Sequence, residues 1–156
     1  MKYKIIFLDI DGTLTDSRKL ITEKTRRAIM KAAENGLIIA VASGRPEPGL
    51  AYAAGELEMS DIGGYLLPFN GGIIKNAMTG EVIASDTISR EALETAYKTA
   101  KKYGIGIITY KEGDIIAADR TDEYIDIESR INGMPVKLTD NFLETVDFAP
   151  VKCLLT

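Results

Sequence analysis

The fold is decided by one short stretch, IIFLDIDGT at residues 5–13. An apolar run leads into Asp9, which predicts a strand over residues 4–9 that ends in a carboxylate. Gly12 then breaks the strand and lets the chain curl, because glycine adopts turn conformations at no steric cost. Asp9 and Asp11 are two positions apart, so they point the same way if the strand simply continues. The stretch therefore predicts a pair of carboxylates presented together at a strand end.

The chain after this stretch alternates helices and strands. Thr22 is a plausible N-cap for a helix of about residues 23–35, and the continuous apolar run at residues 37–42 is typical of a parallel strand covered on both faces. Another helix follows Pro46 and a third strand spans residues 65–69. This β-α-β-α-β order is the repeat of an open parallel sheet with right-handed crossovers. The prediction is an α/β fold with a Rossmann-like parallel-sheet core.

After Gly72 the pattern changes to α+β. It predicts a hairpin over residues 73–84, a helix from the Ser89 cap to Tyr103, strands at 105–110 and 115–118 paired across Gly113 and Asp114, short helices at 122–131 and 140–146, and a strand at 151–155. We place the boundary near residues 80–86. The predicted domains are a core at residues 1–82 and an α+β part at residues 83–156.

Composition excludes several classes of function. The 156 residues are 46% hydrophobic and 27% charged, which is ordinary for a globular protein, and the net charge of −4 without a basic stripe argues against nucleic acid. The apolar run before Asp9 is too short for a signal peptide or membrane span, and one cysteine, Cys153, fits a reducing compartment. We therefore expect a cytoplasmic protein without a membrane partner.

The sequence contains no histidine, so acid–base chemistry falls mainly to carboxylates and a metal site must be rich in oxygen. Mg²⁺ is the natural candidate ion. Polar residues follow all three predicted strands: Asp9 with Asp11, Ser43 with Arg45, and Asn70 with Gly71. Ligands of open α/β sheets bind beyond the carboxyl ends of the strands, so these residues mark a candidate site.

The two carboxylates suit phosphoryl transfer. Asp9 can attack phosphorus, Asp11 can protonate the leaving oxygen and later activate water, and a metal can neutralise the repulsion between Asp9 and the phosphoryl oxygens. The alternatives are a solvated turn and a calcium loop. An EF-hand counted from Asp9 needs an acid and a glutamate where this chain has Thr13 and Leu20, and no P-loop motif is present.

Three motifs carry a family resemblance. Residues 7–14, FLDIDGTL, resemble the first motif of the haloacid dehalogenase (HAD) superfamily; ASGRP at 42–46 resembles its second motif in the Cof-type, class IIB branch; and NGG at 70–72 resembles the segment after the third core strand there. The resemblance implies a HAD-like core with an inserted cap. The spacing of 34 positions from Asp9 to Ser43 leaves room for one helix crossover, so the cap must follow the third strand, as in C2-capped members.

The resemblance also implies roles. Asp9 would form an aspartyl-phosphate, and Asp11 would be the acid/base; both would hold Mg²⁺, Asp11 through its backbone carbonyl. Thr13 would support the loop, and Ser43 would bond the phosphoryl group unless it is only a helix N-cap. Arg45 would contact substrate, or else form a surface ion pair. Asn70 would contact substrate, or else only shape a turn. The predicted phosphate- or substrate-binding set is Gly12, Thr13, Ser43, Gly44, Arg45, Asn70 and Gly71.

The implied function is a Mg²⁺-dependent phosphatase of small phosphorylated metabolites such as sugar phosphates. The lysine of the family's third motif and the acidic fourth motif are not seen, so core and cap both look incomplete and the chain resembles the N-terminal part of a longer phosphatase. We expect weak or no turnover from these residues alone, an exposed sheet edge, and either self-association or a complementing C-terminal fragment. The alternatives are a phosphomutase of the same fold and a non-catalytic fragment that binds phosphate or a partner.

Overall fold

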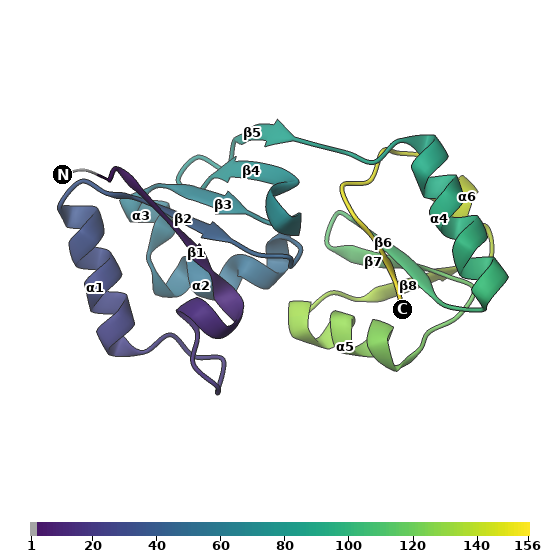
Figure 1. The fold of residues 1–156 in the computed structure, drawn as a ribbon, viewed down its shortest axis with the longest axis horizontal. Helices are drawn as coiled ribbons and strands as arrows, with labels where there is room; N and C mark the ends of the chain where they lie inside the picture. Colours follow the sequence, from purple (N-terminus) through teal and green to yellow (C-terminus); the bar gives the residue numbers. More distant parts are fainter. Residues whose placement is uncertain (1–2) are drawn as a thin grey trace. The chain divides into compact units, whose positions relative to one another are not determined.

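The computed structural model describes residues 3–156, and the chain divides into two compact units with the boundary between Ser85 and Asp86 (Figure 1). The predicted division between residues 82 and 83 falls inside β5 (Val82–Ser85), the last strand of the first unit. That the second unit serves as a cap stays a prediction. Among the described residues, none of the helices combines the length and the apolar character needed to cross a bilayer.

The first unit is built on a five-stranded sheet in the order β1-β2-β3-β4-β5. β1, β2 and β3 pair in parallel, whereas β3, β4 and β5 pair antiparallel. The predicted parallel core and the predicted hairpin are both confirmed. The remaining strands of the unit are β1 (Ile5–Asp9), β2 (Ile38–Ala42), β3 (Tyr65–Leu67) and β4 (Ile73–Asn76).

The first crossover is a helix that starts where the sequence predicts. α1 (Glu23–Glu34) begins after Thr22, whose side chain accepts a hydrogen bond from the Thr25 N–H. The second crossover is not the single helix expected. It is divided into η2 (Glu47–Leu50), α2 (Ala51–Glu56) and α3 (Met59–Ile62), and Glu58 before α3 has a left-handed φ of 50°. A left-handed residue cannot continue a right-handed helix, so the crossover breaks there.

The helices of this unit pack against one face of the sheet. Ile29 of α1 and Leu57 after α2 join Val41 of β2 in one buried cluster. The opposite face is only partly covered, because Phe7 is 60% exposed and Ile38 is 42% exposed. The expectation that the run at residues 37–42 is covered on both faces is therefore wrong at its first residues. Among residues 3–156, β1 pairs only with β2 and is an edge of the sheet, as predicted.

The second unit is a four-stranded sheet in the order β8-β7-β6-β9. α4 and α6 cover one face, where Leu93, Ala100 and Phe142 pack against Ile107 and Ile116, and α5 lies on the other face (Figure 1). The elements are α4 (Arg90–Tyr103), β6 (Ile107–Lys111), β7 (Asp114–Ala118), α5 (Glu123–Asn132), β8 (Val136–Thr139), α6 (Phe142–Thr145) and β9 (Cys153–Leu155).

Two details of the second unit differ from the sequence prediction. The β6–β7 turn consists of Glu112 and Gly113, both with positive φ, so Asp114 belongs to β7 instead of the turn. β8 was not predicted. It is a four-residue strand paired in parallel with β7, and its Leu138 is 55% exposed. Such a short strand without buried alternation carries little sequence signal.

Gly64, just before β3, gives a test of how tightly the first unit is packed. Its φ is +105°, and a Cβ atom there would lie 2.1 Å from the backbone oxygen of Ile39. We expect Gly64→Ala to lower the free energy of unfolding by at least about 2 kcal/mol, since strain and overpacking add. Gly36→Ala is the control, because Gly36 also has a positive φ but nothing lies within 4 Å of its Cβ position. Urea unfolding measures both; equal losses would contradict the packing argument.

Candidate active site

Parallel pairing aligns the ends of three strands in the first unit. Asp9, the last residue of β1, pairs with Ala42 of β2, and Ala42 pairs with Leu67 of β3. The Ser43 N–H donates to the Leu67 carbonyl at 3.0 Å, which extends the pairing by one residue. The segments that are predicted to form the site therefore start side by side at the carboxyl ends of these three strands.

The turn after β1, η1 (Ile10–Leu14), presents Asp11 and Gly12 to solvent. Gly12 has φ +79°, which favours glycine. The turn is closed by Thr15, whose N–H and hydroxyl both donate to the Ile10 carbonyl, at 3.0 and 2.8 Å. Thr15 is 6% exposed, and its hydroxyl supports the turn. Thr13 is exposed, and its predicted role in the loop stays a prediction. Thr15 is not part of the predicted site, because a threonine two residues after Thr13 gives no distinct signal in the sequence.

Asp11 is held by a bidentate ion pair with Arg45. The Arg45 Nε donates to Asp11 Oδ2 at 2.9 Å and its Nη2 donates to Oδ1 at 2.8 Å, across 34 residues of sequence. This two-bond geometry is the strong form of an arginine–carboxylate contact. The Arg45 hydrogen bond is the main cause that lowers the pKa of Asp11, and partial burial opposes it. Arg45 is thus paired with a candidate site residue instead of a distant surface charge.

A second cation reaches the same carboxylate. Lys19 Nζ donates to Asp11 Oδ1 at 2.8 Å and adds to the lowering of the Asp11 pKa. Lys19 lies in the loop between η1 and α1, and the sequence analysis did not select it. A lone lysine in a polar loop gives no pattern, so only the folded chain could reveal this contact.

The ends of β2 and β3 are tied together by their backbones. The Asn70 N–H donates to the Ser43 carbonyl at 2.8 Å, and the Phe69 N–H donates to the Arg45 carbonyl at 2.9 Å. Phe69, Asn70 and Gly71 all have positive φ, a strained run that is typical of functional sites. Gly44 leaves room for Asn70, because a Cβ there would lie 3.0 Å from Asn70 Oδ1. The structure thus brings Ser43, Gly44, Arg45 and Asn70 together.

Ser43 is 5% exposed, and its hydroxyl oxygen accepts a hydrogen bond from the Arg45 N–H at 3.3 Å. It is not a helix N-cap, because the cap position of the next helical turn is Pro46. That alternative reading of Ser43 is therefore wrong. The arrangement joins an exposed carboxylate at Asp9, an ion-paired carboxylate at Asp11, and the Ser43 hydroxyl next to strained backbone.

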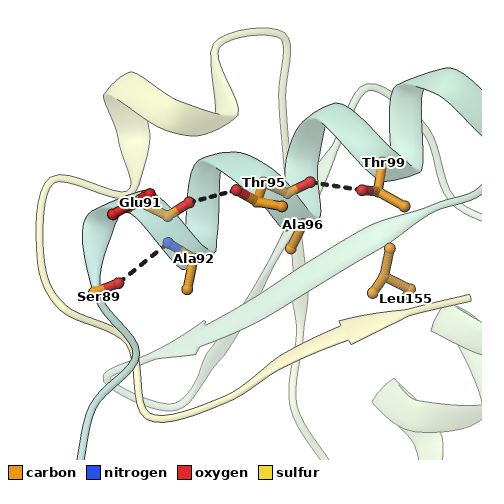
Figure 2. A pocket seen from close by; sticks show the side chains of 7 residues that line it. All are labelled: Ser89, Glu91, Ala92, Thr95, Ala96, Thr99 and Leu155. Carbon is orange, nitrogen blue, oxygen red and sulfur yellow. Dashed lines mark hydrogen bonds between the residues drawn. The ribbon is translucent and has the colours of Figure 1, made fainter.

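The second unit offers no comparable set of groups among its described residues. Burial raises the pKa of the Cys153 thiol, which makes it a poor nucleophile, and burial likewise raises the pKa of Tyr110, whose hydroxyl donates to Glu128 at 2.7 Å. A groove of about 510 Å³ between α4 and Leu155 is lined mainly by small side chains (Figure 2). The hydroxyls of Thr95 and Thr99 in it donate to helix carbonyls. Apart from Glu91, the side chains that line this groove are uncharged, so it offers no pair of titratable groups.

Replacing Arg45 by methionine tests the ion pair. We expect the pKa of Asp11 to rise toward its usual 3.8 in Arg45→Met. Because the folded pKa is the lower one, the pair stabilises the protein above pH 3.8 and the stabilisation is lost as the pH falls through the folded value. The loss is at most about 1 kcal/mol, since Asp11 is partly exposed.

The measurement is a ¹³C NMR titration of the Asp11 carboxyl group, with urea unfolding at pH 7 and pH 3. Arg27→Met is the matched control, since Arg27 pairs with Glu23 on the surface of α1. An Asp11 pKa that is the same in Arg45→Met as in the wild type would refute the assignment.

Comparisons with known proteins agree with this geometry. The family model of haloacid dehalogenase-like hydrolases matches residues 6–156. A candidate phosphatase of Streptococcus pyogenes is 31% identical over 138 residues, which cover 87% of this chain and 51% of that protein. A phosphoglycolate phosphatase of Methanospirillum hungatei is 27% identical, over 86% of this chain and 59% of that protein. The chain thus spans about half the length of the first of these curated relatives.

Solved structures show the same fold. A haloacid dehalogenase-like hydrolase from Bacteroides thetaiotaomicron is 35% identical with a TM-score of 0.87, over 99% of this chain and 58% of that one. The HAD subclass IIB sugar phosphatase BT4131 is 24% identical with a TM-score of 0.76, over 96% of this chain and 57% of that one, and supports the fold alone. With the family model covering nearly the whole sequence, this chain belongs to the haloacid dehalogenase-like hydrolases.

Proposed function

We propose that the full-length protein is a Mg²⁺-dependent phosphatase that acts on small phosphorylated metabolites through an aspartyl-phosphate at Asp9. One observation carries the proposal: Asp9 ends β1 in register with β2, and Asp11 is joined to the end of β2 by its bidentate contact with Arg45. The family membership and the phosphatases among the relatives support the same reaction class.

In the proposed reaction a carboxylate oxygen of Asp9 attacks the phosphorus of a phosphate monoester. A new phosphorus–oxygen bond forms, the ester bond breaks, and the electron pair goes to the leaving oxygen, which takes a proton from Asp11 in its protonated form, although the contacts with Arg45 and Lys19 lower the Asp11 pKa and favour its carboxylate. Water then attacks the aspartyl-phosphate, gives its proton to Asp11, and releases inorganic phosphate and the Asp9 carboxylate. The products are an alcohol and phosphate, and Asp11 returns to its starting state.

The remaining residues of the predicted set would hold the phosphoryl group. Ser43 can donate its hydroxyl proton, because its oxygen already accepts from the Arg45 N–H and the proton is left for a ligand. The turn at Gly12 can direct backbone N–H groups toward an anion. Gly44, Asn70 and Gly71 would shape the wall of the site, where three positive φ values fix the backbone. Thr13 stays a predicted member of this set.

The chemistry of the available donors fits Mg²⁺. The carboxylate of Asp9 and the backbone carbonyl of Asp11 are hard oxygen ligands, and Mg²⁺ commonly uses one or two carboxylates with phosphate oxygens and water. Among residues 3–156, no three His, Cys, Asp or Glu side chains gather into a larger metal cluster. When bound, the ion would neutralise charge between Asp9 and the phosphoryl oxygens.

The substrate class is proposed from the relatives. One relative is named a phosphoglycolate phosphatase, so a small phosphorylated metabolite is the natural class. A cytoplasmic location suits such a metabolite and stays a prediction. The second unit would contribute selectivity as the cap.

Substitution of Asp9 in the full-length protein tests the reaction. We expect Asp9→Asn to lower kcat for p-nitrophenyl phosphate by at least about a thousandfold, because an amide is a poor nucleophile. Chelation of Mg²⁺ should abolish turnover, and BeF₃⁻ should bind to wild-type protein but not to Asp9→Asn, as seen by ¹⁹F NMR. Asp61→Asn, an exposed acid in α3, is the control. A wild type that binds BeF₃⁻ without turnover would favour a non-catalytic phosphate-binding protein and contradict the proposal.

The exposed edge of the first sheet supports a second proposal, which concerns the partners of this chain. β1 is an unpaired edge and its Phe7 is 60% exposed, a combination that favours strand addition by another polypeptide segment. We propose that residues 1–156 pair there with a second copy or with a complementing segment. Light scattering should show self-association of residues 1–156 that rises with concentration and falls in Phe7→Lys. Tyr103→Lys, at an equally exposed aromatic residue of the second unit, is the control. A monomer at all concentrations that also binds no complementing segment would refute this.

A further inference from the structure

The loop between η1 and α1 contains a tightly bonded turn at residues 16–20. The Asp16 N–H donates to the Leu20 carbonyl at 2.9 Å, and the Lys19 N–H donates to the Asp16 carbonyl at 2.9 Å. The Asp16 side chain accepts from the backbone N–H groups of Arg18 and Leu20, at 2.9 and 3.1 Å. These bonds within the turn fix its shape, although the segment is exposed.

Lys19 occupies the strained position of this turn. Its φ is +62°, a left-handed conformation that is unfavourable for a residue with a side chain. Glycine or asparagine would be the ordinary choice there. The side chain returns eight residues along the chain and places Nζ 2.8 Å from Asp11 Oδ1. A costly backbone conformation thus carries the one side chain of the turn that reaches the candidate site.

The contact of Lys19 with Asp11 adds a restraint that the contact of Arg45 with Asp11 does not provide. Arg45 binds both oxygens of Asp11 from the end of β2, and Lys19 binds Oδ1 from a different segment of the chain. Two cations from two directions restrict the carboxyl group more than one can, because rotation away from either cation loses a charged hydrogen bond. A lone surface pair would not need a braced turn behind it.

We propose that Lys19 is a positioning residue that holds the Asp11 side chain in the direction required for proton transfer, and that the turn at Asp16–Leu20 exists to place it. This inference rests on the proposed function of Asp11 as acid and base. Lys19 then matters most for substrates whose leaving oxygen needs a proton. An alkyl phosphate releases a strongly basic alkoxide, whereas p-nitrophenyl phosphate releases an anion that is stable without protonation.

The test compares these two leaving groups in the full-length protein. We expect Lys19→Met to lower kcat for glycerol 2-phosphate about tenfold more than kcat for p-nitrophenyl phosphate, because the loss of positioning outweighs the higher Asp11 pKa in this variant. Lys19→Arg should restore most of the loss, since it returns the cation. Asp16→Ala should reproduce the pattern by releasing the turn. Lys24→Met, an exposed lysine at the start of α1, should change neither rate.

Equal losses on both substrates, or wild-type rates in Lys19→Met, would overturn the inference. A readout without turnover separates it from the proposed function. The ¹³C NMR signal of the Asp11 carboxyl group should shift in Lys19→Met and in Asp16→Ala but not in Lys24→Met. If the wild type hydrolyses neither ester, the phosphatase proposal fails, and an unshifted Asp11 signal would then also refute the contact.

Discussion

The candidate site depends on one constraint, the in-register parallel pairing of β1, β2 and β3. Because Asp9, Ala42 and Leu67 pair across three strands, the segments that follow them start at the same height on the sheet. A shift of one residue in β1 would turn Asp9 to the other face, since side chains alternate along a strand. The contacts between residues 11 and 45, and between residues 43 and 70, all follow from this alignment.

The sequence predicted most of this framework because the signals are local. Thr22 and Ser89 cap α1 and α4, as their positions in the sequence predict. The alternation of helices and strands predicts the parallel core. It could not predict contacts between distant residues. The bidentate pair of Asp11 and Arg45 and the reach of Lys19 depend on side-chain directions that exist only after folding. The break at Glu58 and the short β8 carry too weak a pattern to compete with the elements around them.

The sheet that aligns the site also places part of the site at the edge of the sheet. The strand that carries Asp9 is an edge strand. On one face of the sheet, the side chains of Phe7 and Ile38 are exposed. An edge strand with apolar side chains is a place where other chain segments add. The proposed nucleophile, Asp9, therefore lies at the end of one of the two edge strands of this sheet.

The balance of charges in the candidate site is the reason to propose a further cation there. When ionised, Asp9 and Asp11 bring two negative charges, and Arg45 and Lys19 bring two positive charges that are already directed at Asp11. A phosphate group that approaches Asp9 thus meets a set with no net positive charge, although phosphoryl transfer depends on stabilising negative charge. The two side-chain cations fix Asp11 and do not compensate the phosphate. A hard divalent ion at Asp9 would supply the missing charge, which is the electrostatic reason for proposing Mg²⁺ there.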